Sequence, residues 1–114
     1  MPDTLRTAVA SIAISGALVV ASAGLAQADE IALTIKDHRI SPAEIHVPAK
    51  QDVTLRVTNA DPTPEEFESD DLDVEKVIAG GESAVIHLSP LDPGRYEFYG
   101  EYHEDTAKGA LVAE

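Results

Sequence analysis

The feature that most constrains the fold is a two-residue alternation of apolar and polar side chains, repeated in short segments over residues 29–114. The clearest case is residues 53–58, where Val53, Leu55 and Val57 share one face. An extended chain places successive side chains on opposite faces, so this period is typical of a half-buried strand. No segment in this range has the three-to-four-residue apolar spacing of an amphipathic helix. The pattern therefore predicts an all-β domain.

The alternating segments are separated by turn residues at intervals of roughly ten positions. Pro62 and Pro64 break the chain after the segment at 53–58, Gly80 and Gly81 form a later turn, and Gly94 another. Many short strands with such punctuation favour an antiparallel Greek-key β-sandwich of seven to eight strands. The expected strands are residues 31–36, 44–48, 53–58, 74–78, 83–88, 95–100 and 110–112, with the acidic segment near residue 66 extended as well.

Residues 1–28 have the pattern of a secretory signal peptide. Arg6 precedes an apolar stretch, and Ala26-Gln27-Ala28 supplies the small residues of a cleavage site. The alternative is a membrane anchor, but Ser and Gly residues interrupt the apolar stretch. We therefore expect cleavage after Ala28, export to the periplasm, and a single domain at 29–114 that is not inserted in the membrane.

The formal net charge of −13 falls on this domain, because Asp3 and Arg6 cancel within the first 28 residues. Phosphate backbones and anionic lipid surfaces repel such a chain, which argues against nucleic acid as a partner. The sequence has no cysteine, so neither a disulfide nor a thiolate metal ligand is available. Cations and basic partner proteins remain as binding partners.

Two segments could carry chemistry. In the acidic segment, Glu66 and Glu68 flank Phe67. If the segment is extended, Phe67 faces the core and both carboxylates face the opposite side. Two carboxylates on one face suit iron(III), manganese or calcium, and they also accept copper(II). The other interpretation of this acidic run is a solvated loop.

The second segment follows an aromatic strand near the C-terminus, in which Tyr96, Phe98 and Gly100 share a face. His103 stands where that strand ends, with Glu101 and other acids beside it. A histidine in this position is a plausible metal ligand, although a lone histidine is more often structural. The remaining histidines are weaker candidates: His46 and His87 lie on the polar faces of strands, and His38 lies in a turn.

The order of these features resembles the cupredoxin family, which consists of small exported Greek-key sandwiches. Residues 93–99 read PGRYEFY, similar to the start of the cupredoxin copper-ligand loop, and the resemblance extends from residue 31 to 112. In that family the loop supplies a cysteine, a histidine and a methionine, and an earlier segment supplies another histidine. His103 matches the loop histidine, but Gly100 stands at the cysteine position and Lys108 at the methionine position. Glu66 stands near the first histidine.

These departures exclude a blue-copper electron carrier, since that centre needs a thiolate. A closer resemblance is to the cupredoxin-like proteins that accompany bacterial high-affinity iron permeases, including the cupredoxin domain of the periplasmic ferrous-iron uptake component. It rests on the Glu-aromatic-Glu segment at 66–68, the following residues 74–77, and the loop at 100–109. It implies binding of iron or copper, and oxidation or delivery of iron to a permease.

Three functional hypotheses follow. The first is a periplasmic accessory of iron uptake, with ferroxidase activity as one form of it and a copper or iron ion held by Glu66, Glu68, Glu101 and His103. The second is a copper carrier or chaperone that uses the same residues without turnover. The third is a module without metal, whose acidic face docks a basic partner. The residues alone establish only a sandwich with carboxylates and one histidine in suitable places.

Overall fold

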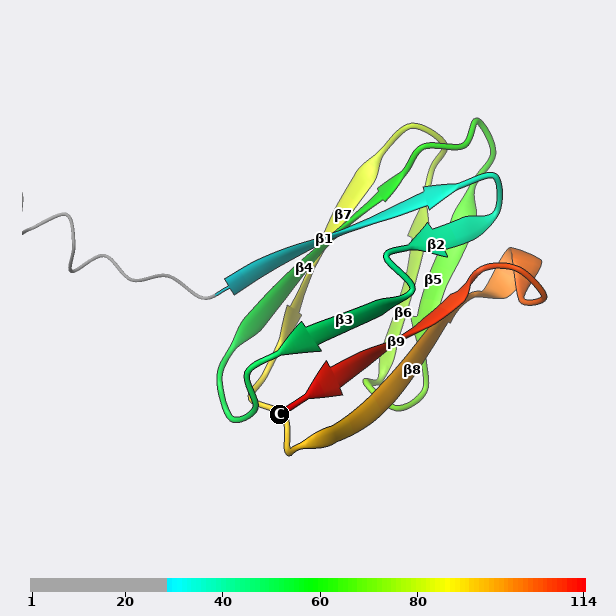
Figure 1. Cartoon of the computed structure of the whole chain (residues 1–114). Helices are drawn as coiled ribbons and strands as arrows, with labels where there is room; N and C mark the ends of the chain where they lie inside the picture. Colours follow the sequence, from blue (N-terminus) through cyan, green and yellow to red (C-terminus); the bar gives the residue numbers. More distant parts are fainter. Residues whose placement is uncertain (1–28) are drawn as a thin grey trace, which may run out of the picture.

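The computed structural model describes residues 29–114, which form nine β-strands and one short 3-10 helix, η2 (Figure 1). The predicted signal peptide and its cleavage site lie outside the described residues. The elements are β1 (Asp29–Lys36), β2 (Arg39–Ser41), β3 (Glu44–Val47), β4 (Val53–Asn59), β5 (Glu65–Ser69), β6 (Val74–Ile78), β7 (Ser83–Leu88), β8 (Gly94–Gly100), η2 (Glu101–His103) and β9 (Lys108–Ala113).

The strands form two packed sheets, as the alternation predicted. One sheet has the order β2-β1-β4-β7 and the other β3-β9-β8-β5-β6. The expected antiparallel pairing does not extend to two pairs of strands, because β1 runs parallel to β4 and β3 runs parallel to β9. A two-residue period reveals which face of a strand is buried but not the direction of its neighbour.

One strand was missed in the sequence. Residues 39–41 are not among the expected strands, yet they form β2, which pairs with β1 through Ile35↔Ile40. Only Ile40 of its three residues is buried, so no alternation was visible. The turn of this short hairpin consists of Asp37 and His38, and it brings His38 against His103.

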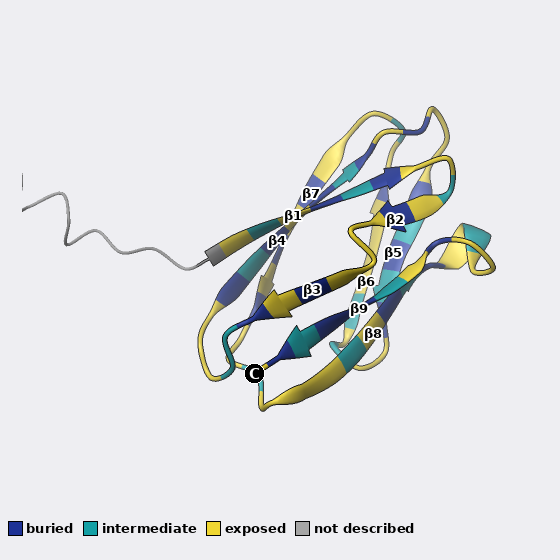
Figure 2. Cartoon of the chain, in the orientation of Figure 1, coloured by how far each residue is buried: buried dark blue, intermediate teal, exposed yellow. Residues whose placement is uncertain are grey.

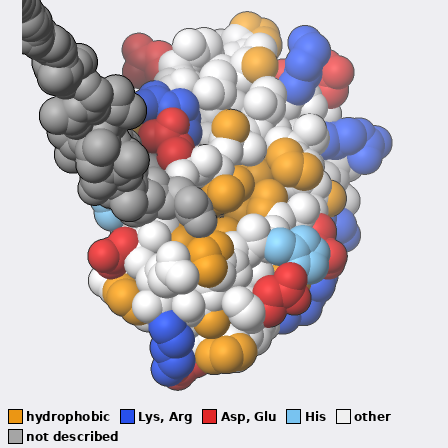
Figure 3. All heavy atoms as spheres, turned by 60° about the vertical axis from the view of Figure 1, so that its left-hand side comes forward, with side chains coloured by type: hydrophobic (Ala, Val, Ile, Leu, Met, Phe, Trp, Pro, Cys, Tyr) orange, Lys and Arg blue, Asp and Glu red, His pale blue; other side chains and the backbone are white. Residues whose placement is uncertain are grey.

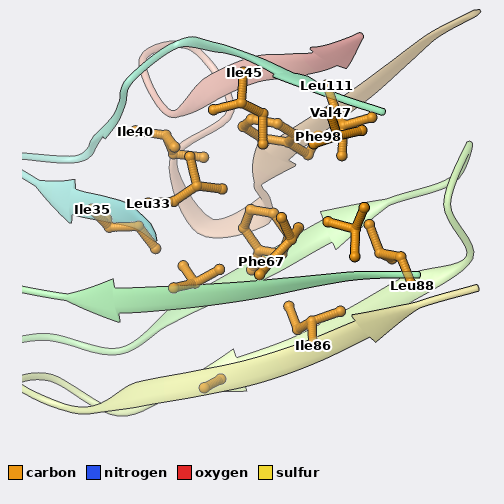
Figure 4. Packing of buried hydrophobic residues seen from close by; sticks show 14 of the residues in the cluster. Leu33, Ile35, Ile40, Ile45, Val47, Phe67, Ile86, Leu88, Phe98 and Leu111 are labelled. Atoms are coloured by element: carbon orange, nitrogen blue, oxygen red, sulfur yellow. The ribbon is translucent and has the colours of Figure 1, made fainter. Parts of the chain in front are cut away.

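The core lies between the two sheets and takes one side chain from every second position of most strands (Figure 2). Phe67 of β5 and Phe98 of β8 meet near its centre, with ring centroids 5.3 Å apart and planes inclined by 34°. Figure 4 shows Leu33 and Ile86 packing toward this pair from the other sheet. Burial of Phe67 fixes β5 so that its neighbours in sequence, residues 66 and 68, face outward.

The surface carries charges of both signs. On the face drawn in Figure 3, acidic and basic side chains lie around a central group of hydrophobic ones. Among residues 29–114, no helix has the length and apolar character needed to span a membrane.

Candidate metal centre

Three of the four predicted ligands lie together. Glu66, Glu68 and Glu101 each offer a carboxylate oxygen, and these oxygens lie within 4.8 Å of one another. We call these three residues the acidic trio. The group does not include His103, the fourth predicted ligand.

The sandwich itself positions the acidic trio. Glu66 and Glu68 alternate with the buried residues of β5, so they share the outer face of that strand, as the sequence predicted. β8 runs antiparallel beside β5 with Phe67 opposite Gly100, and η2 begins at the next residue. Glu101 therefore leaves the end of β8 next to the two strand glutamates.

The electrostatics are those of crowded negative charge. The hydrogen bond between Glu101 and Glu68 raises the pKa of Glu101 to about 7, and partial burial and the nearby carboxylates act in the same direction. Partial burial also raises the pKa of Glu66, with a further contribution from Glu75, which faces Glu68 across the β5–β6 pair. A proton shared between Glu101 and Glu68 relieves this repulsion, and a cation would relieve it as well.

Glu68 is the most constrained member of the acidic trio. Tyr99 donates its phenolic hydrogen to Glu68 Oε2 at 2.8 Å, and this bond is the main cause that raises the pKa of Tyr99. Hydrogen bonds from Glu101 and Tyr99 lower the pKa of Glu68 itself. Its other oxygen, Oε1, is buried and has no hydrogen-bond partner among the described residues. A buried unpaired acceptor is unfavourable, and a cation bound at this oxygen would satisfy it.

His103 contacts Glu65, a buried residue of β5, instead of the acidic trio. Its Nδ1 is 2.6 Å from Oε2 of Glu65, a carboxylate that is only 1% exposed. Oε1 of the same carboxylate accepts hydrogen bonds from the backbone N–H of Tyr102 at 2.9 Å and of Glu66 at 3.0 Å. Glu65, not Glu66, is therefore the acidic residue that stands beside His103 and Gly100.

Several functional candidates escaped the sequence reasoning. Glu65 shares the parity of the buried Phe67, and that signal was available in the sequence. Glu75 and Tyr99 become visible only through the strand register, which places each opposite Glu68. His38, a weak candidate in the sequence, stacks on His103 with centroids 3.6 Å apart. His46 and His87 are exposed on their strands, as predicted.

The residues of this chain fit a hard or borderline cation better than a blue-copper centre. The acidic trio supplies oxygen ligands only, and the sequence has no cysteine to provide a thiolate. A small two-sheet sandwich with converging carboxylates beside the end of β8 is, as a class, a candidate metal-binding domain.

The chain belongs to the cupredoxin-like domain family, whose model matches residues 8–113. A curated relative, the uncharacterized protein RP394 of Rickettsia prowazekii (strain Madrid E), is 47% identical over 83 residues. That alignment covers 73% of this chain and 66% of the relative, so the chain spans about two thirds of the relative's length.

Solved structures show the same fold at low sequence identity. The metal-binding domain of the Cu(I)-exporting P-type ATPase CopA of Streptococcus pneumoniae D39, solved with Cu(I), superposes with a TM-score of 0.69 at 20% identity, over 80% of this chain and 91% of that one. Auracyanin A, a blue copper protein of Chloroflexus aurantiacus, superposes with a TM-score of 0.65 at 16% identity, over 75% of this chain and 98% of that one. The cupredoxin-like sandwich predicted from the sequence is thus confirmed.

Proposed function

We propose that this protein binds an iron or copper ion at the acidic trio and serves, in the periplasm, as an accessory of a high-affinity iron permease. One observation carries the metal site: three carboxylates converge within 4.8 Å, and one of their oxygens, Glu68 Oε1, is buried without a partner among the described residues. Such an arrangement is costly unless a proton or a cation occupies it. His103, predicted as a fourth ligand, has its Nδ1 committed to Glu65.

The chemistry of the ligands supports iron as the cargo. Carboxylate oxygens are hard ligands that favour iron(III) over iron(II), so a bound ferrous ion is easier to oxidise. Each iron(II) ion that is oxidised at the acidic trio gives up one electron. Dissolved oxygen is the electron acceptor, and its consumption can be measured. Delivery without oxidation requires only reversible binding at the same three residues.

The relatives support copper as the alternative cargo. The CopA domain was solved with Cu(I), and auracyanin A is described as a blue copper protein. Copper(II) also stands highest in the affinity order of divalent first-row metals for a given oxygen or nitrogen site. A copper carrier without turnover is therefore the second candidate function.

Metal titration of the purified protein tests the site. We expect isothermal titration calorimetry to detect binding of copper(II) under air and of iron(II) without oxygen. We expect the triple variant E66Q/E68Q/E101Q to weaken the iron(II) binding by at least 100-fold. The control variant E30Q/D92N/E114Q removes the same number of charges from exposed ion pairs with Arg56, Lys50 and His46. If both variants lose iron(II) affinity equally, the binding depends only on the net charge of the protein, and the proposed site is wrong.

A second measurement separates oxidation from carriage. An iron-oxidising accessory consumes oxygen continuously when ferrous iron is added in excess, and the rate falls in the triple variant. A carrier binds its metal in a fixed ratio and shows no steady consumption above that of buffer. If no metal binds at micromolar concentration and none raises the melting temperature, the iron accessory and the copper carrier are both excluded. The third hypothesis, an acidic docking module, then replaces them.

The cellular part of the proposal rests on the predicted signal peptide and on the resemblance to iron-uptake accessories. We expect the mature protein in the periplasmic fraction to begin at Asp29, which N-terminal sequencing determines. We also expect deletion of the gene to impair growth under iron limitation. Growth restored by the wild type but not by E66Q/E68Q/E101Q would tie the uptake role to the acidic trio.

A further inference from the structure

Glu65 is a buried carboxylate that the acidic trio does not use. Its side chain is only 1% exposed, although it begins β5 and directly precedes Glu66. Burying a carboxylate is unfavourable unless hydrogen bonds satisfy its oxygens. Both oxygens of Glu65 have such partners, and these partners lie in β5 and η2, the two segments that carry the acidic trio.

One oxygen of Glu65 connects the backbone at Glu66 to the backbone at Glu101. Oε1 accepts the backbone N–H of Glu66 at 3.0 Å and that of Tyr102 at 2.9 Å. The first N–H belongs to a member of the acidic trio. The second belongs to the peptide bond between Glu101 and Tyr102, so it is part of the peptide unit that follows another member. A single acceptor atom therefore ties together the two segments that supply the three carboxylates.

Strand pairing does not make this connection. Among the described residues, the ladder between β5 and β8 ends at the pair Phe67↔Gly100. The next pair in the same register would be Glu66 and Glu101, but the chain turns into η2 after Gly100. Glu65 thus supplies hydrogen bonds at the point where the ladder between the two strands stops.

The second oxygen of Glu65 anchors the end of η2. Nδ1 of His103, the last residue of η2, lies 2.6 Å from Oε2. One face of the His103 ring is covered by the ring of His38, with centroids 3.6 Å apart. Thr106, in the loop after η2, donates its hydroxyl to the His38 carbonyl. The carboxylate of Glu65 is therefore fixed through both oxygens and has little freedom to turn away.

Glu65 does not itself reach an ion at the acidic trio. Its oxygens are engaged elsewhere, and they are not among the carboxylate oxygens that lie within 4.8 Å of one another. Glu65 also belongs to the buried face of β5, whereas Glu66 and Glu68 belong to the outer face. Its effect on a bound ion must therefore pass through the backbone positions of the ligands.

We propose that Glu65 is the positioning residue of the acidic trio, which sets the distance between Glu66 and Glu101 without touching the ion. Carboxylates on two separate segments bind a cation tightly when their spacing is held in advance, because the cost of ordering the segments then does not oppose binding. Glu65 holds this spacing through hydrogen bonds that need no metal. The inference rests on the proposed function, since it takes the acidic trio as the site of the ion.

Iron(II) titration without oxygen tests this role in three variants of the purified protein. Glu65→Ala removes both acceptor oxygens and should weaken binding about 10- to 100-fold, the usual loss for a group that orients metal ligands. Glu65→Gln keeps an acceptor for the N–H groups of Glu66 and Tyr102 and should restore most of the affinity. Leu88→Ala leaves a cavity in the core at β7, in the other sheet, and should lower stability without changing the affinity.

The titration separates positioning from a general loss of stability. If Leu88→Ala weakens iron(II) binding as much as Glu65→Ala does, affinity follows stability and Glu65 has no positioning role. If Glu65→Gln binds as weakly as Glu65→Ala, the effect comes from the charge of Glu65, which also contradicts the proposal. Wild-type affinity in Glu65→Ala would refute the role of Glu65 and leave the acidic trio as the proposed site.

A measurement without metal keeps this inference separate from the proposed function. In the NMR spectrum of the metal-free wild type, we expect nuclear Overhauser contacts between the methylene protons of Glu101 and those of Glu66 and Glu68, whose carboxylate oxygens lie within 4.8 Å of one another. In Glu65→Ala these contacts should disappear, while the contacts between the two core phenylalanine rings remain and show that the variant is folded.

The two measurements together decide each part. If the wild type binds no iron but loses the contacts on Glu65→Ala substitution, the proposed function is wrong and the positioning role of Glu65 stands. If the contacts persist in Glu65→Ala, or are absent from the wild type, the positioning role is wrong whether or not iron binds.

Discussion

The carboxyl group of Glu65 occupies the space that a side chain at Gly100 would need. A β-carbon placed on Gly100 would lie 2.7 Å from Glu65 Cδ and 2.9 Å from the β-carbon of Ala107. The resemblance to cupredoxins puts Gly100 at the position of the copper-ligating cysteine. The space beside Gly100 is filled, since the carboxylate of Glu65 from the neighbouring strand β5 stands there and contacts His103.

Gly100→Ala should destabilise the domain by about 1–3 kcal/mol, because the added methyl group overpacks a filled site. Glu65 cannot move away cheaply, since it accepts hydrogen bonds from Glu66, Tyr102 and His103. Urea denaturation followed by circular dichroism measures the change in the free energy of unfolding.

Gly94→Ala is the matched control at the other end of β8. A β-carbon there would meet only the ring of Tyr96, at 3.7 Å or more, which is ordinary van der Waals contact. We expect a change within about 0.5 kcal/mol. Equal effects of the two substitutions would show that Gly100 is not sterically constrained.

Glu65→Ala should cost about 3 kcal/mol of stability, because it leaves the backbone N–H groups of Glu66 and Tyr102 and the ring of His103 without their acceptor. Glu65→Gln retains an acceptor oxygen and should cost less. Glu30→Ala, which removes an exposed partner of Arg56, should cost less than about 1 kcal/mol. Chemical denaturation measures the free energy of unfolding of the three variants. If Glu65→Ala destabilises the domain no more than Glu30→Ala does, the structural role of Glu65 is refuted.

Asp61 accepts hydrogen bonds from the turn that carries His38, so the stability of the domain should depend on pH in acid. Burial acts to raise the pKa of Asp61, but the hydrogen bonds from the backbone N–H groups of His38 and Asp37 outweigh it and hold the pKa below the ordinary value of 3.8. A carboxyl group whose pKa is lower in the folded state stabilises the fold above its unfolded pKa. This contribution is lost as the pH falls through the folded value.

The wild type should therefore lose stability as the pH is lowered below about 4, and Asp61→Asn should lose part of that dependence. The free energies of unfolding of the two proteins should differ most near neutral pH and converge in acid. Urea denaturation at a series of pH values measures both curves. A constant difference at every pH would assign the effect of the substitution to the shape of the side chain rather than to its charge.

The fold was predictable because most strands bury alternate residues. The segment at 53–58 appears as β4 with Val53, Leu55 and Val57 fully buried. The parallel pairing of β1 with β4 was not predictable, because it depends on which sheet each strand joins. The position of Ile40 in β2 was hidden for a simpler reason, since three residues are too few to display a period.

The candidate site was predictable in part. The outward pair Glu66 and Glu68 followed from the burial of Phe67, and Glu101 followed from the resemblance in the last loop. The bond between Glu65 and His103 joins residues 38 positions apart. No local pattern reports such a contact, because strand register and the entry of η2 decide it together.

Tyr99 should tune the metal affinity of the acidic trio without ligating the ion. Its hydroxyl donates to Glu68 Oε2 at 2.8 Å and so orients the carboxylate whose other oxygen is buried and, among the described residues, unpaired. Loss of a partner that orients a ligand typically weakens metal binding by about 10- to 100-fold. Tyr99→Phe should therefore weaken iron binding about tenfold in calorimetric titrations.

Tyr96→Phe is the matched control, because it removes a hydroxyl of the same strand that donates to the Asp92 carbonyl at 2.7 Å, away from the acidic trio. It should leave the metal affinity unchanged, and each substitution should change the free energy of unfolding by about 1 kcal/mol. If both tyrosine variants bind iron as the wild type does, Glu68 is not oriented by Tyr99 in the bound state. If Tyr96→Phe alone weakens binding, the ion lies elsewhere than at the acidic trio.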